Sequence, residues 1–216
     1  MLTRSDQTVG DCLEVLEEIR PIGLGHIGFK DVGVPPETLR QLVAGIVAQG
    51  AITSMEVVCT SAEAALTSAR VARDIGVQRL LGGTQVDEIL AILAGSDTTY
   101  HPFPGKPTGH PTKLGGTPAD VEADCRRFAA KGCAGVDLLA YRATEADPIE
   151  LVRAARRGTP GYLLGAGSVA TPVQIAALAA AGADAFTIGS AAFDGSFSPL
   201  LGSLRSQLRA ILDACR

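Results

Sequence analysis

Residues 162–195, YLLGAGSVATPVQIAALAAAGADAFTIGSAAFDG, decide the fold. Two short apolar runs, YLL and AFTI, each end in small residues, and one helical pattern lies between them. An apolar strand that stops at glycine and continues into a helix leaves free backbone N–H groups, and such groups bind anions. Two such ends on adjacent strands predict one shared phosphate site. The residues expected to form it are Gly165, Gly167, Ser168, Gly189 and Ser190.

The same alternation of a short apolar run with a helical pattern repeats about every 25 residues, which is the size of one β/α unit. Prolines and Ser/Thr residues open several of the helical patterns, and glycines close several of them. The expected strands are residues 1–6, 26–31, 52–58, 79–83, 98–103, 135–141, 161–167 and 185–190. The expected helices are residues 9–20, 35–49, 61–75, 86–94, 118–131, 148–156, 172–181 and 199–214.

Eight such units within 216 residues are typical of a compact (β/α)8 barrel, or TIM barrel, that spans residues 1–216 as one α/β domain. A doubly wound open sheet is the alternative. That fold usually places its glycine-rich phosphate loop after the first strand, whereas here the glycine-rich ends follow the seventh and eighth. The longest irregular stretch, residues 102–116 (PFPGKPTGHPTKLGG), is interpreted as an inserted loop.

The amino-acid composition limits the classes of partner that the protein is expected to bind. The net charge is −4 and basic clusters are nearly absent, which argues against nucleic acid, because phosphate-backbone binding needs a basic face. No apolar run approaches twenty residues and the first residues do not resemble a signal peptide, so we expect a cytoplasmic protein without a membrane partner. Self-association into a homo-oligomer stays open. The five cysteines are expected to be reduced core residues: Cys12, Cys59, Cys125, Cys133 and Cys215.

The C-terminal motif also carries a resemblance. GAGSVATPVQIAALAAAGADAFTIGSAAF, residues 165–193, resembles the last quarter of the ribulose-phosphate-binding barrels. These include isomerases of the histidine and tryptophan pathways, N-acylmannosamine-6-phosphate epimerase and the keto-gulonate-phosphate decarboxylase group. The opening SDQTVGDCLEVLEEI, residues 5–19, is similar to the first unit of that last group. The resemblance implies a phosphate-binding barrel and leaves the reaction open.

Side-chain alternation along the strands locates candidate reactive groups. One face of a barrel strand is apolar and faces the helices, while the other faces the interior. This alternation turns Lys30, Glu56 and Asp137 inward and also predicts that Tyr141 points inward. Three charges in one interior are costly to desolvate, which favours a functional cluster over a filler role. Asp6 either adds a fourth polar group or caps the first helix.

The inserted loop together with the end of the preceding strand, YHPFPGKPTGHPTKLGG (residues 100–116), supplies basic residues that would overhang the barrel mouth and close over an anionic substrate. These residues are His101, Lys106, His110 and Lys113. Binding of a divalent metal by the two histidines with Glu56 or Asp137 is an alternative, but their spacing matches no metal motif, so no metal or other cofactor is expected.

A lysine beside two carboxylates can move a proton or stabilise an enolate next to a carbonyl. The sequence therefore favours an isomerase or epimerase that acts on a small phosphorylated sugar or keto acid. A decarboxylase or aldolase is the close alternative. The Asp-x-Lys-x-x-Asp array of the related decarboxylases is not reproduced in SMEVVCTS, residues 54–61, and the sixth-strand lysine of the related aldolases is replaced by Asp137. A third reading is a barrel that binds a phosphorylated metabolite without converting it.

Overall fold

The computed structural model describes residues 1–58 and 61–216, and its parallel strands form two sheets. The first sheet contains, in chain order, β3 (His26–Lys30), β4 (Ile52–Glu56), β5 (Arg79–Leu81) and β6 (Thr99–His101). The second contains β9 (Gly135–Leu138), β10 (Tyr162–Gly165) and β11 (Ala185–Phe186). Each strand pairs in register with its neighbour, as Lys30 does with Glu56.

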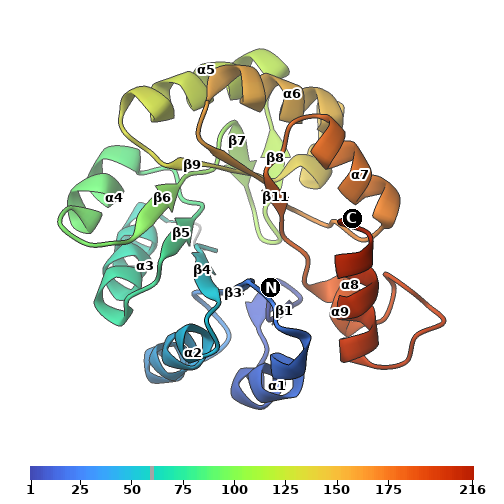
Figure 1. Ribbon diagram of the computed structural model, residues 1–216. Helices are drawn as coiled ribbons and strands as arrows, with labels where there is room; N and C mark the ends of the chain where they lie inside the picture. The colour runs from blue at the N-terminus through green and yellow to red at the C-terminus, as the bar shows by residue number, and fades with distance from the viewer. Residues whose placement is uncertain (59–60) are drawn as a thin grey trace.

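Backbone hydrogen bonds join the two sheets into a ring. On one side, the backbone nitrogen of Asp137 donates to the Pro102 oxygen at the end of β6 (3.0 Å). On the other side, the Met1 nitrogen donates to the Ile188 oxygen (2.7 Å). The Leu2 nitrogen donates to the Gly28 oxygen of β3 (2.6 Å), so residues 1–2 link the end of β11 to β3. The predicted (β/α)8 barrel is therefore confirmed, with its helices around the outside (Figure 1).

The helices begin and end near the predicted positions because their capping signals work as expected. Ser61, Thr117 and Thr171 accept hydrogen bonds from backbone N–H groups three residues ahead. The helices are α1 (Cys12–Ile19), α2 (Pro36–Ala48), α3 (Ala62–Ile75), α4 (Val86–Leu93), α5 (Pro118–Ala130), α6 (Pro148–Gly158), α7 (Pro172–Ala180), α8 (Ser190–Phe193) and α9 (Leu204–Asp213). Two 3₁₀ turns, η1 (Arg20–Ile22) and η2 (Ala140–Arg142), accompany them.

Three segments differ from the prediction. Residues 102–116 are not an irregular loop, because they contain an antiparallel hairpin of β7 (Lys106–Thr108) and β8 (Lys113–Gly115). The expected first strand ends early and turns into a small hairpin of β1 (Thr3–Arg4) and β2 (Gln7–Thr8). The last helix begins at Leu204 because Ser203 caps it, and the short α8 precedes it.

The core lies between the strands and the helices, and Phe29, Met55 and Leu80 are fully buried there. Cys12 and Cys125 belong to this core as predicted, whereas Cys215 is exposed. Cys59 lies outside the described residues. Among the described residues, no helix is both long enough and apolar enough to cross a membrane.

Candidate functional site

Lys30, at the carboxyl end of β3, is held between two carboxylates. Its Nζ lies 3.0 Å from Asp6 Oδ1 and 2.8 Å from Glu56 Oε1, and the three side chains are 7%, 4% and 8% exposed. Glu56 ends β4 directly beside Lys30 in the ladder, so strand alternation sends both side chains to the same face. The predicted meeting of Lys30 with Glu56 inside the barrel is therefore what the structure contains.

Asp6 is not a helix cap. It lies in the turn between β1 and β2, and it also accepts two hydrogen bonds from Arg142, from Nη1 to Oδ2 and from Nη2 to Oδ1, both 2.7 Å. Two parallel hydrogen bonds of this kind fix the orientation of the Asp6 carboxylate relative to the Arg142 guanidinium. Sequence reasoning missed Arg142. Its signal was its place directly after a barrel strand, where side chains line the mouth of the barrel.

The network shifts the pKa values of Asp6 and Lys30 in opposite directions, and both shifts favour the charged forms. Burial alone would raise the pKa of Asp6, but the hydrogen bonds from Arg142 and the charge of Lys30 outweigh it and hold that pKa well below its usual range. Burial would lower the pKa of Lys30, but the charges of Glu56 and Asp6 outweigh it and raise that pKa. Lys30 is therefore a fixed ammonium ion at neutral pH.

Asp137 behaves in the opposite way. Its side chain is fully buried on β9, and neither carboxyl oxygen has a hydrogen-bond partner among the described residues. Burial, followed by the negative charge of Glu56, raises the pKa of Asp137 well above its usual range despite the attraction of Lys30 and Arg142. The interior therefore combines a fixed cation with a carboxyl group whose protonated form is favoured by burial.

A cavity of about 220 Å³ opens above this network. Lys30, Glu56, Asp6 and Arg142 line it together with the two glycine-rich ends of the chain. Asp137 lies outside this lining, deeper in the barrel. The polar network and the predicted phosphate-binding residues thus belong to one site, at the end of the barrel where the strands stop.

The two glycine-rich ends lie side by side in the cavity wall, formed by residues 167–170 and 187–191. Within the described part of the chain, the backbone N–H groups of Gly167, Ser168, Gly189 and Ser190 donate to no protein acceptor. Several free N–H groups around one concavity are suited to an anion.

Gly165 does not belong with them. It does not line the cavity, and a Cβ atom there would lie 2.7 Å from Leu178 Cδ2 on α7. The structure does not bring this predicted phosphate ligand into the cavity and places it instead where α7 packs closely on β10.

Backbone strain is concentrated at the same place. Among the described residues, the non-glycine residues with positive φ are Ser5 (51°), Asp6 (59°) and Ser168 (66°). Left-handed backbone costs a side-chain-bearing residue of order 1–3 kcal/mol, and such residues often cluster at functional sites. Asp6 and Ser168 both line the cavity, and Ser5 precedes Asp6 in the chain. The strain supports this cavity as the functional site.

The basic residues predicted to overhang the barrel mouth lie in different places in the structure. His101 is an interior residue of β6, only 2% exposed, so it does not overhang the mouth. Lys106 is exposed on β7 and its Nζ lies 3.5 Å from Asp120 Oδ2, while His110 is exposed in the turn between β7 and β8. Thr112 in that turn accepts a hydrogen bond from Arg142 (3.3 Å), so the hairpin approaches the site through its backbone.

The expectation that Tyr141 points inward was wrong. β9 ends at Leu138, and the turn η2 directs the Tyr141 hydroxyl to the Gln174 carbonyl on α7 (3.3 Å). In the described part of the chain, no group of three or more His, Cys, Asp and Glu side chains is placed to hold a metal. The two loop histidines in particular are not brought together, because His101 is buried in β6 and His110 is exposed.

Neither the family models nor the curated proteins contain a match to this chain. Solved structures do match. A structure described as native KDPGal has a TM-score of 0.68 at 13% identity, covering 97% of this chain and 90% of that one. Orotidine 5'-phosphate decarboxylase from Pyrococcus horikoshii OT3 has a TM-score of 0.60 at 16% identity, covering 94% and 92%. A putative deoxyribose-phosphate aldolase from Coccidioides immitis has a TM-score of 0.64 at 14% identity, covering 86% and 78%.

The chain also spans about half the length of the FabK structures from Thermotoga maritima that it matches, 56% and 53% of those chains. At these levels of identity the likenesses concern the fold. They agree with the ring of strands described above: the chain has the architecture of a TIM barrel.

Proposed function

We propose that this protein is an enzyme that breaks a carbon–carbon bond next to a carbonyl group in a small phosphorylated sugar or keto acid. The observation that carries the proposal is the position of Lys30, clamped between Asp6 and Glu56 in the cavity that also contains the free N–H groups of residues 167–168 and 189–190. A phosphate bound at those N–H groups would hold the rest of the substrate beside the Lys30 ammonium group.

The ammonium form of Lys30 opposes a Schiff-base mechanism and favours stabilisation of an enolate. A Schiff base requires a neutral amine, and the raised pKa of Lys30 opposes loss of its proton. A fixed cation instead stabilises negative charge as it develops on an enolate oxygen. When the bond breaks, its electron pair passes into this enolate, and carbon dioxide or an aldehyde leaves. In the aldol case a base first removes the hydroxyl proton of the leaving fragment.

The enolate carbon then takes up a proton. In the aldol case the base that took the hydroxyl proton returns it, and after decarboxylation a water molecule supplies it. Asp137 is the carboxyl group of the network whose protonated form is favoured, because burial and the charge of Glu56 raise its pKa. It lies deeper than the cavity, so its role would be to restore a proton to the network afterwards. Asp6, held by Lys30 and Arg142, positions these two cations.

Proton transfer without cleavage, as in an isomerase or epimerase, is the second candidate. The same enolate serves both reactions, and Glu56 in the cavity wall, with Asp137 behind it favouring its protonated form, offers a base backed by an acid. The sequence favours this candidate slightly. The likeness of the fold to proteins named as a decarboxylase and an aldolase shifts our preference to the lyase.

The test begins with binding. Inorganic phosphate and a panel of phosphorylated sugars and keto acids are screened by thermal shift, and the ligands that raise the melting temperature are incubated with the protein in heavy water. Two carbon fragments or released carbon dioxide identify the lyase. Deuterium in an intact carbon skeleton identifies the isomerase or epimerase. Binding with neither product would refute both and leave a non-catalytic binding barrel.

Lys30→Ala tests whether the product in that assay is made by this protein and not by a contaminating enzyme. The variant should lose product formation while its phosphate binding persists. Lys106→Ala is the matched control, because Lys106 is an exposed lysine outside the cavity lining. Equal activity of the two variants would contradict the assignment of Lys30.

A further inference from the structure

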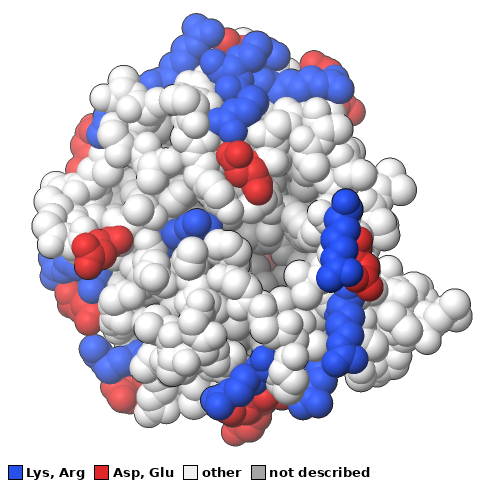
Figure 2. Space-filling view, in the orientation of Figure 1, with Lys and Arg blue, Asp and Glu red and all other residues white. Residues whose placement is uncertain are grey.

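A second, larger cavity lies at the opposite end of the barrel. It has a volume of about 440 Å³, within the range of small-molecule sites. His26, Arg79 and Tyr162, the first residues of β3, β5 and β10, line it, whereas Lys30 is the last residue of β3. Figure 2 shows a hollow near the middle of this face, bordered mostly by uncharged residues. This cavity and the candidate active site share Met1, Thr187 and Ile188 in their walls but lie toward opposite ends of the barrel.

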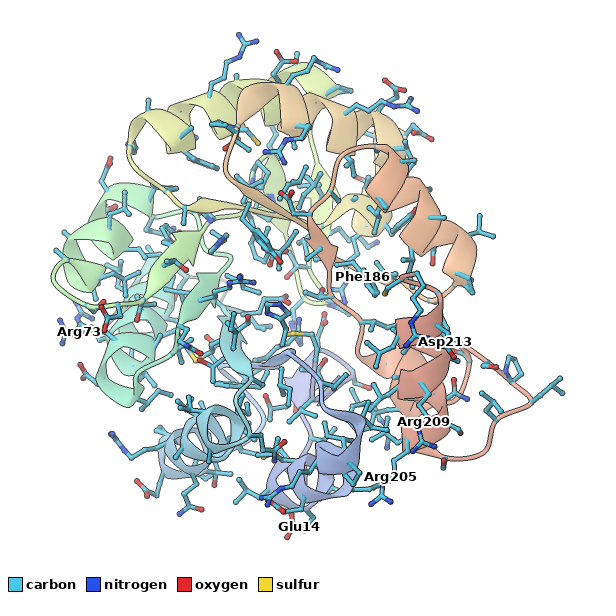
Figure 3. All side chains as sticks on the ribbon, in the orientation of Figure 1. Glu14, Arg73, Phe186, Arg205, Arg209 and Asp213 are labelled. Carbon is cyan, nitrogen blue, oxygen red and sulfur yellow. The ribbon has the colours of Figure 1, made fainter. Side chains whose placement is uncertain are left out.

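The walls of the cavity are apolar on the side of α7 and α9. Phe186 lies on the side of β11 that faces α9 (Figure 3), and Leu208 and Ile211 of α9 line the same space with Leu178 of α7. An apolar cavity of this size is suited to a hydrocarbon or ring system, since burying apolar surface is favourable.

One cation faces this apolar space. The Arg79 guanidinium lies 4.3 Å from the centre of the Tyr162 ring, across the barrel, and it is only partly exposed. Within the described residues, Arg79 forms no ion pair and donates no hydrogen bond to a protein acceptor. Five N–H donors of a half-buried guanidinium without an acceptor are unusual, because buried charges are normally paired.

The other polar groups at this cavity do not supply that acceptor. Asp184 lines the cavity, but it is engaged by Arg156 (2.9 Å) and by the Leu163 N–H (2.8 Å). Burial and the charge of Arg79 lower the pKa of His101 to about 4 and also lower that of His26, so both imidazoles are neutral at pH 7. The Met1 α-amino group also lines the cavity, but it donates to the Ile188 oxygen (2.7 Å) and burial lowers its pKa to about 6, so the unpaired charge at the cavity is the positive charge of Arg79.

We propose that this cavity binds an apolar monocarboxylate, with its carboxylate on the Arg79 guanidinium and its apolar body between β11 and α9. A carboxylate matches the planar fork of arginine in two parallel hydrogen bonds and neutralises its charge. A phosphate dianion would bring an uncompensated negative charge into an apolar cavity, which opposes its binding. The site is independent of the proposed reaction, because Arg79 and Leu208 do not line the active-site cavity.

The test uses decanoate as the probe, decan-1-ol as its uncharged counterpart and isothermal titration calorimetry as the measurement. Wild-type protein should bind decanoate at least tenfold more tightly than decanol. Arg79→Gln should weaken decanoate binding tenfold to a hundredfold, the usual value of a charge-assisted pair, and leave decanol binding unchanged. Arg153→Gln, at an exposed arginine of α6, is the matched control and should change neither.

Leu208→Trp provides the second arm, since a larger side chain would fill the cavity and weaken both probes alike. It also keeps the test valid if Arg79→Gln does not fold. Equal affinity for decanoate and decanol, or decanoate binding that survives Leu208→Trp, would overturn the proposal. A wild-type dimer in sedimentation that decanoate does not affect and that Leu208→Trp dissociates would show that a second copy of the chain occupies this face instead.

Discussion

The same substitution, aspartate to asparagine, should depend on pH at Asp137 and not at Asp6 between pH 5 and pH 7. Asp137 is fully buried without a hydrogen-bond partner among the described residues, and its pKa is raised by burial and by Glu56. Between about pH 4 and its raised folded-state pKa, it is therefore protonated in the folded protein but ionised in the unfolded chain. Each pH unit above about pH 4 favours unfolding by about 1.4 kcal/mol, until the pH reaches the folded-state pKa.

Asp137→Asn removes this dependence, because an amide does not titrate. The free energy of unfolding of the variant, minus that of the wild type, should rise with pH above about pH 5, by at most about 1.4 kcal/mol per pH unit, until the pH reaches the folded-state pKa. The unpaired amide adds a constant offset that does not alter the slope. Asp6 has a lowered pKa, and its stabilising contribution is present above about pH 4 and is lost below it.

Asp6→Asn should therefore give a flat difference between pH 5 and pH 7. We expect it to be destabilising by about 3 kcal/mol, the low end for a broken buried pair, because Arg142 is 20% exposed. Urea unfolding followed by circular dichroism at pH 5, 6 and 7 measures both differences. Parallel curves for Asp137→Asn and the wild type would refute a protonated Asp137, whatever their vertical separation.

Three further predictions concern the site and the scaffold. Lys30→Ala should lower turnover by about a hundredfold or more, the usual value of a group that stabilises charge developing in the transition state, with inorganic phosphate affinity nearly unchanged in calorimetry. Gly167→Leu should weaken phosphate binding, since φ there is +79°, whereas Gly165→Ala should lower the melting temperature through its 2.7 Å approach to Leu178 and leave phosphate affinity intact. Thr117→Ala should cost about 1 kcal/mol in urea unfolding through loss of a helix cap, and no loss would show that the cap is dispensable.

Much of the barrel could be predicted from the sequence because two independent sequence signals agree. Apolar runs give the strands, capping residues give the helix starts, and strand parity then places Lys30 and Glu56 on one face. The alternation of side-chain directions holds only within a strand and no longer applies where the strand ends. Tyr141 and Arg142 follow the end of β9 in a 3₁₀ turn, so the alternation no longer determines where they point, and Arg142 was missed for that reason.

The other differences from the expected structure have the same kind of cause. A glycine at a strand end can admit an anion or a neighbouring helix, and only the 2.7 Å approach to Leu178 assigns Gly165 to the second role. The hairpin of β7 and β8 has few apolar residues to alternate, and its position depends on the buried Leu114 and its contacts with residues 143–144. The cavity at Arg79 arises from the spacing between β11 and α9, which no local pattern encodes.

The left-handed residues at Ser5, Asp6 and Ser168 have a consequence for how a ligand meets this site. Their conformational cost is met when the chain folds, so the cavity wall exists in its strained form before any ligand arrives. Binding then needs little rearrangement of these segments, and less of the interaction energy is lost to ordering them. The free and occupied forms should be nearly superimposable here, and selectivity would come from the fit of a rigid wall rather than from closure around the ligand.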